Sequence, residues 1–302
     1  MAKPVRLAVI GRGRWGKNII KTLEAMPGCV VAYAVARNYT ELLKKNDIDG
    51  VVVATPSSTH AKVALPFIQK GLSTFIEKPM TTSLMNARRI MAASRKHKTP
   101  VFVGHIHLYN PAYLIAKKVI RRVGKLHVLV GEGMSFGPFR GDASAMWDWA
   151  PHDLSMMLDI TGTMPTSVQA WGKAVLRPKT RLHNITYMKL NFPSGIVGII
   201  HSSKISPEKK KRLTVVGSRS TVVYEDSAEK KVAVYKKGMT PTIFPSYPAA
   251  MPLAEEMKAF VQTVKTRKKP KTDVLQGLEV VAILEAAEKS IGQDGKRVRI
   301  KR

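Results

Sequence analysis

Short apolar runs alternate with amphipathic stretches through the first hundred residues. Runs of β-branched and apolar residues are typical of buried parallel strands, whereas apolar side chains repeated every three to four positions indicate helices. The pattern predicts strands at residues 5–10, 29–35, 49–55, 72–76 and 100–104. Helical segments fall between them, with Ile19, Ile20 and Leu23 on one face of the first. Repeated strand–helix units predict a doubly wound parallel sheet.

The rhythm changes after Gly104. Longer strand candidates follow one another at residues 126–134, 167–176, 185–192, 196–201, 212–216, 221–224 and 232–235. Helices are expected at residues 111–122, 151–160, 253–266 and 274–291. Consecutive strands joined by short turns favour an open, largely antiparallel sheet. We therefore expect an α/β chain: a Rossmann-type dinucleotide-binding domain at 1–105, and an α+β domain for substrate binding and oligomerisation at 106–302.

Composition narrows the class of protein. The 302 residues are 44% hydrophobic, which supplies ordinary cores and argues against disorder. Cys29 is the single cysteine, so no intrachain disulfide can form and a reducing cytoplasm is the expected location. The chain enters a strand within a few residues, which leaves no room for a signal peptide. No apolar stretch approaches the ~20 residues that span a bilayer, so we expect no membrane association.

The formal charge of +29, from 50 basic and 21 acidic residues, creates a positive field that attracts anions. The basic residues are dispersed, although segments 204–212, 265–271 and 296–302 are dense. Aromatic residues hardly interleave them, unlike a platform for stacking nucleic-acid bases. We therefore expect a solvated basic surface and no specific nucleic-acid partner.

A glycine-rich turn follows the first strand. Gly11-x-Gly13-x-x-Gly16 leads from a strand into a helix, which is the context that a dinucleotide-binding motif requires. Glycine permits the tight turn and the close approach of a pyrophosphate to the helix N-terminus. The expected cofactor contacts are Gly11, Gly13, Arg14, Trp15 and Gly16. The alternative is a tight turn that binds nothing.

The end of the second strand lacks the acidic residue that usually binds the adenine ribose. Ala36, Arg37 and Asn38 stand there instead, and the helix that follows is short. Arg37 fits the 2′-phosphate of NADP, which favours NADP over NAD, or it is an ordinary surface arginine.

The fourth strand closes on Glu77-Lys78-Pro79. Ligands of open α/β sheets bind beyond the carboxyl ends of the strands, so these residues are placed to meet one. Thr55 and Pro56 end the third strand in the same way and are expected to contact the cofactor. His60 lines the cofactor site or makes a structural hydrogen bond.

Asp148 and His152 form the second candidate constellation. Proline is tolerated in a first helical turn, so Pro151 predicts that a helix begins here, with Asp148 as its N-cap. His152 would then lie just inside the first turn, where the positive helix end disfavours imidazolium and leaves a neutral base. The alternative is a capping aspartate and a packed histidine.

Other residues carry weaker signals. His105-x-His107 has no evident third ligand, so no metal site is expected. Tyr109 and Asn110 follow the domain crossing, where they border the substrate or start a helix at Pro111. The sequence contains no P-loop.

These motifs together resemble the glucose–fructose oxidoreductase and inositol dehydrogenase family, often written Gfo/Idh/MocA. The resemblance covers nearly the whole chain. It runs through the glycine turn, segment 47–56, His60, Glu77-Lys78-Pro79, segment 109–111 and segment 147–153, and then through Pro207, segment 209–217 and segment 253–257. Segment 37–43 departs from it, because family members usually have an acidic residue and a full helix there.

The resemblance implies roles for single residues. Glu77 would contact the nicotinamide ribose, Lys78 would lie between cofactor and substrate, and Asp148 with His152 would supply catalytic groups. It implies an NAD(P)-dependent oxidoreductase that interconverts a secondary ring alcohol and a ketone on a sugar or nucleotide sugar. His152 would be the acid–base, and Lys78 would polarise the substrate oxygen. The rival hypothesis is a non-catalytic nucleotide-binding sensor or nucleic-acid-associated protein.

The resemblance also implies assembly, because the open sheet of family members packs against a partner subunit. Segments 167–171 and 185–192 alternate sides without a uniformly charged face. Exposure of the aromatic side chains of Trp171 and Tyr187 to solvent would be unfavourable. A homodimer or homotetramer formed through residues 165–235 is therefore expected.

Overall fold

The computed structural model describes residues 3–139, 141, 143–176, 182–193, 195–236, 238 and 240–301. It divides into two compact units, Met1–Tyr109 with Ala250–Val281, and Asn110–Ala249 with Ala282–Arg302. The first crossing lies a few residues beyond the boundary expected near residue 105. The return of residues 250–281 to the first unit adds a feature that the strand pattern does not contain. Within the described residues, every helix is too short or too polar to cross a bilayer.

The first unit is built on a parallel sheet with the strand order β2-β1-β3-β4-β5. Its strands are β1 (Val5–Ile10), β2 (Cys29–Val35), β3 (Gly50–Val53), β4 (Ser73–Glu77) and β5 (Val101–Gly104). Its α-helices are α1 (Arg14–Glu24), α2 (His60–Gln69), α3 (Leu84–Lys96) and α6 (Pro252–Thr266), and α7 (Val274–Ile291) begins in it. Short 3₁₀ segments lie at Tyr39–Lys44, Ser57–Thr59 and Ile106–Tyr109. The predicted doubly wound parallel sheet is confirmed.

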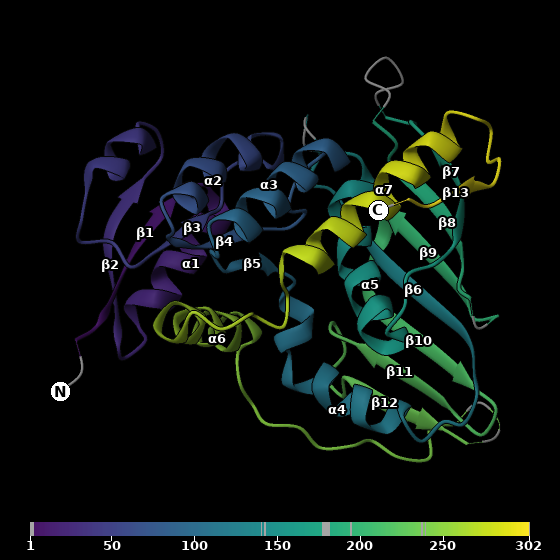
Figure 1. Ribbon diagram of the computed structural model, residues 1–302. Coiled ribbons are helices and arrows are strands. Elements are labelled where there is room, and N and C mark those ends of the chain that lie inside the picture. The colour runs from purple at the N-terminus through teal and green to yellow at the C-terminus, as the bar shows by residue number, and fades with distance from the viewer. Residues whose placement is uncertain are drawn as a thin grey trace. The chain divides into compact units, whose positions relative to one another are not determined.

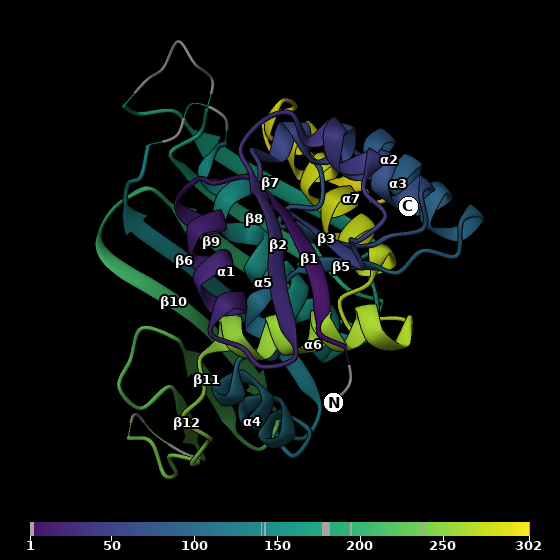
Figure 2. The same ribbon diagram turned by 90° about the vertical axis from the view of Figure 1, so that its left-hand side faces the viewer.

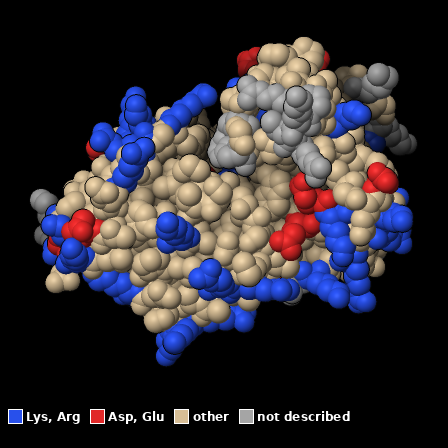
Figure 3. Space-filling view, turned by 90° about the horizontal axis from the view of Figure 1, so that it is seen from above, with Lys and Arg blue, Asp and Glu red and all other residues tan. Residues whose placement is uncertain are grey.

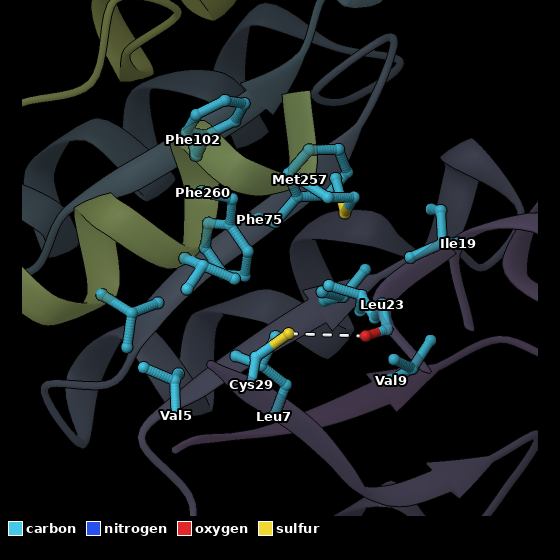
Figure 4. Packing of buried hydrophobic residues seen from close by; sticks show 13 residues of the cluster. Val5, Leu7, Val9, Ile19, Leu23, Cys29, Phe75, Phe102, Met257 and Phe260 are labelled. Atoms are coloured by element: carbon cyan, nitrogen blue, oxygen red, sulfur yellow. Dashed lines mark hydrogen bonds between the residues drawn. The ribbon is translucent and has the colours of Figure 1, made fainter. Parts of the chain in front are cut away.

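Helices cover both faces of this sheet. Helices α2 and α3 lie on one face, and α1 and α6 lie side by side on the other (Figure 1 and Figure 2). The core beneath α1 and α6 joins Ile19 and Leu23 to Phe75, Phe102 and Phe260 (Figure 4). Burying one such large apolar side chain contributes roughly 1.5–3 kcal/mol. This packing explains why α6, from late in the sequence, belongs to the first unit.

The second unit contains an eight-stranded sheet with the order β12-β11-β10-β6-β9-β8-β7-β13. Its strands are β6 (Leu126–Phe136), β7 (Ser167–Lys173), β8 (Ile185–Asn191), β9 (Val197–Ser203), β10 (Ile205–Gly217), β11 (Thr221–Glu225), β12 (Val232–Tyr235) and β13 (Val298–Arg299). Its helices are α4 (Pro111–Ile120), α5 (Ala145–Thr161) and the end of α7. Strands β6 and β9 pair in parallel, and the other pairs are antiparallel. The largely antiparallel sheet is thus confirmed.

One face of this sheet packs against α5, which contacts β6, β8 and β9. Trp171, Tyr187 and His201 are aligned across β7, β8 and β9. The Tyr187 and His201 rings stack with centroids 4.3 Å apart. Trp171 and Tyr187 are each 47% exposed and Ile199 is 39% exposed. The sheet therefore carries a partly apolar row of side chains at its surface.

Candidate functional site

The glycine turn adopts the geometry that the motif requires. Gly11 has φ of +110°, and a Cβ there would collide with the Ala54 carbonyl group. A Cβ on Gly16 would collide with the Gly11 carbonyl oxygen, so the close approach of helix and turn depends on both glycines. Among the described residues, no heavy atom lies within 4 Å of the Cβ position of Gly13, the N-cap of α1. This open helix N-terminus can accept a phosphate.

Trp15 connects the first turn of α1 to the end of β4. Its indole N–H donates a hydrogen bond to Glu77 Oε1, and the Lys78 backbone N–H donates to Glu77 Oε2 at 3.1 Å. Gly104 is the partner of Glu77 on β5, and a Cβ there would lie 3.1 Å from Glu77 Oε1. The carboxylate therefore occupies space that only a glycine leaves at this point of the sheet.

Two buried carboxyl groups interact beside this strand end. Burial raises the pKa of Glu77 to about 7, although the Trp15 hydrogen bond and the Lys78 ammonium oppose the rise. Glu256 of α6 is fully buried, and neither of its carboxyl oxygens has a hydrogen-bond partner among the described residues. Burial, reinforced by the charge of Glu77, raises the pKa of Glu256 well above its usual range. Burial therefore favours the protonated form of the Glu256 carboxyl group.

His105 lies directly after β5 and is completely buried. Neither ring nitrogen has a hydrogen-bond partner in the described part of the chain. Burial, with the Lys78 ammonium acting in the same direction, lowers the pKa of His105 to about 3. The ring is thus neutral, and Lys78 is a half-buried cation close enough to influence it.

His60 bridges the ends of two strands. Its ring nitrogens lie 2.8 Å from the Thr55 carbonyl oxygen and 3.0 Å from the Pro79 carbonyl oxygen. The Thr55 hydroxyl in turn pairs with Thr59 at 2.8 Å. His60 is 1% exposed, so these contacts support the hypothesis that it makes structural hydrogen bonds. Thr55 and Pro56 follow the carboxyl end of β3, and their contact with a cofactor stays a prediction.

Arg37 follows β2 and is exposed. Asn38 has φ of +56° and starts the 3₁₀ segment Tyr39–Lys44, which replaces a full helix. The short element that the sequence predicts is therefore present.

Helix α5 begins earlier than Pro151 suggests. Ser144 is its N-cap, and the Ser144 hydroxyl accepts a hydrogen bond from the Trp147 N–H. The prediction that Asp148 caps this helix is wrong: Asp148 lies in the first turn, and Pro151 lies inside the helix. His152 is consequently two turns from the helix start. The helix dipole acts mainly within the first turn, so it does not by itself keep His152 neutral.

Asp148 forms an ion pair with Lys204, which follows β9. Asp148 Oδ2 lies 3.0 Å from Lys204 Nζ, and the Lys204 side chain is 3% exposed. His152 lies four positions after Asp148 on α5, which places the two residues on the same helix face. The second unit thus brings together both members of the predicted Asp-x-x-x-His pair. Lys78 belongs to the first unit, and His152 belongs to the second.

Asp153 is a further buried acid on α5. Its Oδ2 has no partner among the described residues, and burial, reinforced by the charge of Glu132, raises its pKa well above the usual range. Gly131 and Gly133 of β6 make room for α5, because a Cβ on Gly131 would lie 2.7 Å from Asp153 Cγ. Sequence reasoning missed Asp153, although two glycines inside a strand signal a close approach. It also missed Glu256 and Lys204.

Tyr109 and Asn110 make structural contacts. The Tyr109 hydroxyl pairs with Thr272 Oγ1 at 3.0 Å, and its ring stacks on Phe102. Asn110 caps α4 by accepting from the Ala112 N–H, and it donates to Asp226 at 2.9 Å. The helix start at Pro111 is therefore confirmed, and the substrate-bordering role of both residues stays a prediction.

Basic side chains are spread over the face shown in Figure 3, and acidic ones are fewer. The described residues contain no group of three His, Cys, Asp or Glu side chains arranged to hold a metal ion. The pair of His105 and His107 therefore gains no third ligand from this part of the chain.

Comparison with protein families gives two matches. Residues 24–105 match the model described as "Oxidoreductase family, NAD-binding Rossmann fold". Residues 115–223 match the model of the GFO/IDH/MocA C-terminal domain. Together the matched ranges cover more than half of the chain and both of its units.

Individual proteins show the same likeness. The chain is 29% identical to scyllo-inositol 2-dehydrogenase (NAD⁺) of Bacillus subtilis over 309 residues, 89% of each chain. It is 29% identical to UDP-N-acetylglucosamine 3-dehydrogenase of Acidithiobacillus ferrooxidans over 170 residues, 56% of this chain and 53% of the other. An inositol dehydrogenase homologue from Azotobacter vinelandii, solved with NAD⁺, shares the fold with a TM-score of 0.87 at 16% identity, covering 99% of this chain and 98% of the other.

Proposed function

The chain belongs to the Gfo/Idh/MocA oxidoreductase family, and on that premise we propose that it interconverts a secondary ring alcohol and a ketone on a sugar derivative. The observation that carries this proposal is the end of β4, where Glu77 is held by Trp15 of the glycine turn and is followed by Lys78. This strand end places a cation, Lys78, beside the NAD-binding fold, where it could interact with a substrate oxygen. The dehydrogenase names of the relatives support the same reaction class.

The residues of the first unit fit a dinucleotide. The open space at Gly13 leaves a helix N-terminus accessible to the pyrophosphate, and Glu77 offers a carboxylate to a ribose hydroxyl. A bound nicotinamide supplies the hydride acceptor or donor for the reaction. Arg37 and the short segment after it support a preference for NADP over NAD.

The protein's own groups handle the proton. We assign His152 as the base that takes the alcohol proton and as the acid that returns it in the reverse direction. Asp148 places a carboxylate one helical turn before His152, on the same face of α5. The Lys78 ammonium stabilises negative charge as it develops on the substrate oxygen.

Cofactor binding gives the direct test of this function. Fluorescence titration should show saturable binding of NADH or NADPH, and comparison of the two dissociation constants tests the preference for NADP. Absence of binding of both at millimolar concentration would overturn the proposal.

The proposed substrate is anionic, a nucleotide-linked amino sugar or uronic acid. The +29 charge and the likeness to a UDP-N-acetylglucosamine dehydrogenase over about half the chain support this choice. The inositol dehydrogenase relatives favour a neutral substrate instead. A panel of UDP-sugars, free sugars and inositols, assayed by NAD(P)H absorbance, decides between them. Turnover of neutral substrates alone would refute the anionic class.

A non-catalytic sensor remains the rival function, motivated by the replaced helix after Arg37. The rival predicts saturable cofactor binding without turnover of any substrate in the panel. The buried arrangement around Asp148 argues for chemistry, because an ion pair of this kind is costly to build.

We also propose that the chain forms a homodimer or homotetramer through the open face of the second sheet. The exposed side chains of Trp171, Tyr187 and Ile199 support this surface. Tyr187→Lys should reduce the mass measured by light scattering, whereas Met85→Lys, at a 66% exposed position of the first unit, should not. A monomer mass for the wild-type protein across micromolar concentrations would refute assembly.

A further inference from the structure

Lys204 is a lysine in a place where lysine is costly. Its side chain is 3% exposed, whereas lysine is almost never buried unless it is paired. Its Nζ donates to the Ala143 carbonyl oxygen at 2.9 Å and pairs with Asp148 Oδ2 at 3.0 Å. The two partners flank Ser144, the N-cap of α5. One ammonium therefore contacts the chain just before the helix and a carboxylate in its first turn.

The backbone of Lys204 is fixed on both sides. Its N–H donates to the Asn184 carbonyl oxygen at 2.8 Å, and its carbonyl oxygen accepts from the Gly137 N–H at 2.9 Å. The Ala145 N–H at the start of α5 donates to the His183 carbonyl oxygen at 2.8 Å. The backbone of Lys204 and the start of α5 are thus both hydrogen-bonded to neighbouring segments of the second unit.

An apolar side chain could fill this space without the cost of burying a charge. The ammonium does two things that an alkyl chain cannot. It holds one oxygen of the Asp148 carboxylate and so sets the orientation of that group, and it compensates a negative charge on the helix face that carries His152. These effects are needed only if the geometry and charge of Asp148 matter.

We propose that Lys204 is a positioning residue for the reaction, which acts by orienting and neutralising Asp148 one helical turn before His152. The inference rests on the proposed dehydrogenase function, since it assigns the residue that prepares the acid–base pair. Lys204 acts through Asp148 and does not itself touch the substrate.

The test is a double-mutant cycle on turnover. K204M should lower kcat about 100-fold, because small misplacements of catalytic groups have effects of this size, and should leave the NADH dissociation constant unchanged. In a D148N background, the same Lys204 substitution should lower kcat by no more than about threefold, since the group through which it acts is already gone.

Lys117 of α4 provides a matched control, because its partner Asp159 lies on the same helix as Asp148. It pairs with Asp159 at 2.7 Å in the last turn of α5, with side chains 25% and 12% exposed. K117M should therefore keep kcat within about twofold of the wild type, although it also removes an ion pair from α5. If K204M does not fold, the comparison of D148N with K204M/D148N still tests the proposal, because the double variant leaves no unpaired buried charge. A loss of kcat greater than about threefold in this background would overturn an effect that acts through Asp148.

The outcomes separate the two proposals. A wild-type protein without dehydrogenase activity would overturn the proposed function, and this inference with it. An active wild-type enzyme in which K204M has an equal effect in both backgrounds, or no effect in the wild-type background, would overturn the role of Lys204 alone.

Discussion

The two units treat buried charge in opposite ways. In the first unit, the like-charged groups Glu77 and Glu256 are buried together, and burial raises the pKa of both. In the second unit, the opposite charges of Lys204 and Asp148 lie 3.0 Å apart. Buried charges must be neutralised by a proton or by a partner. The comparison shows that burial raises carboxyl pKa values at the end of β4, whereas the start of α5 pairs opposite charges.

Breaking the Lys204–Asp148 ion pair should have the largest effect on the free energy of unfolding. K204M leaves Asp148 without its cation in a partly buried site, so it should lower the free energy of unfolding by about 3–5 kcal/mol. K204M/D148N removes both charges and should recover most of that loss. Denaturant unfolding of the three variants measures this. A double variant that is less stable than K204M would contradict the paired-charge account.

The first unit should instead respond to pH. Glu77 has an ordinary pKa of 4.5 and a folded-state pKa of about 7, so its stabilising contribution is present at acid pH and is lost as the pH rises through about 7. The pKa of His105 is lowered from 6.5 to about 3, so its contribution has the opposite sign and rises with pH between these values. The two contributions oppose each other between about pH 4.5 and 6.5.

E77Q should uncover the contribution of His105. The free energy of unfolding of this variant should rise more steeply than that of the wild type between pH 5 and 7, with a difference of up to about 3 kcal/mol from the Glu77 shift. Denaturant midpoints at several pH values measure the slope. Parallel wild-type and E77Q profiles would show that Glu77 has an ordinary pKa.

The smallest effect is expected at Glu256. Burial favours the protonated form of Glu256, and a protonated carboxyl group resembles the amide of glutamine in shape and charge, so E256Q should change the free energy of unfolding at pH 7 by less than about 1 kcal/mol. This contrasts with K204M, although both positions are fully buried or nearly so. A loss of several kcal/mol at Glu256 would mean that it carries a charge, and the contrast between the two units would fail.

Local signals in the sequence were sufficient for much of this arrangement. The glycine turn and the strand end at Glu77 each depend on neighbouring residues, and the structure has the turn as predicted. The predicted start of α5 was wrong, because Pro151 lies inside the helix and Ser144 is the N-cap. The position of Pro151 alone does not indicate that a serine seven residues earlier caps the helix.

Long-range pairings could not be predicted in this way. Lys204 and Asp148 are 56 positions apart, and Glu77 and Glu256 are 179 apart, so no periodicity links them. Their meeting depends on how β9 approaches α5 and how α6 returns to the parallel sheet. Lys204 is one of 50 basic residues, and its burial alone distinguishes it.

The most direct test of the account measures turnover and cofactor binding together. Wild-type protein, given its best substrate from the panel, should form NAD(P)H, and H152A should lower kcat by about 10²–10⁴-fold while its cofactor dissociation constant stays unchanged. That result would show that the second unit supplies the acid–base group and the first unit binds the cofactor. An H152A variant with wild-type kcat would contradict the central claim.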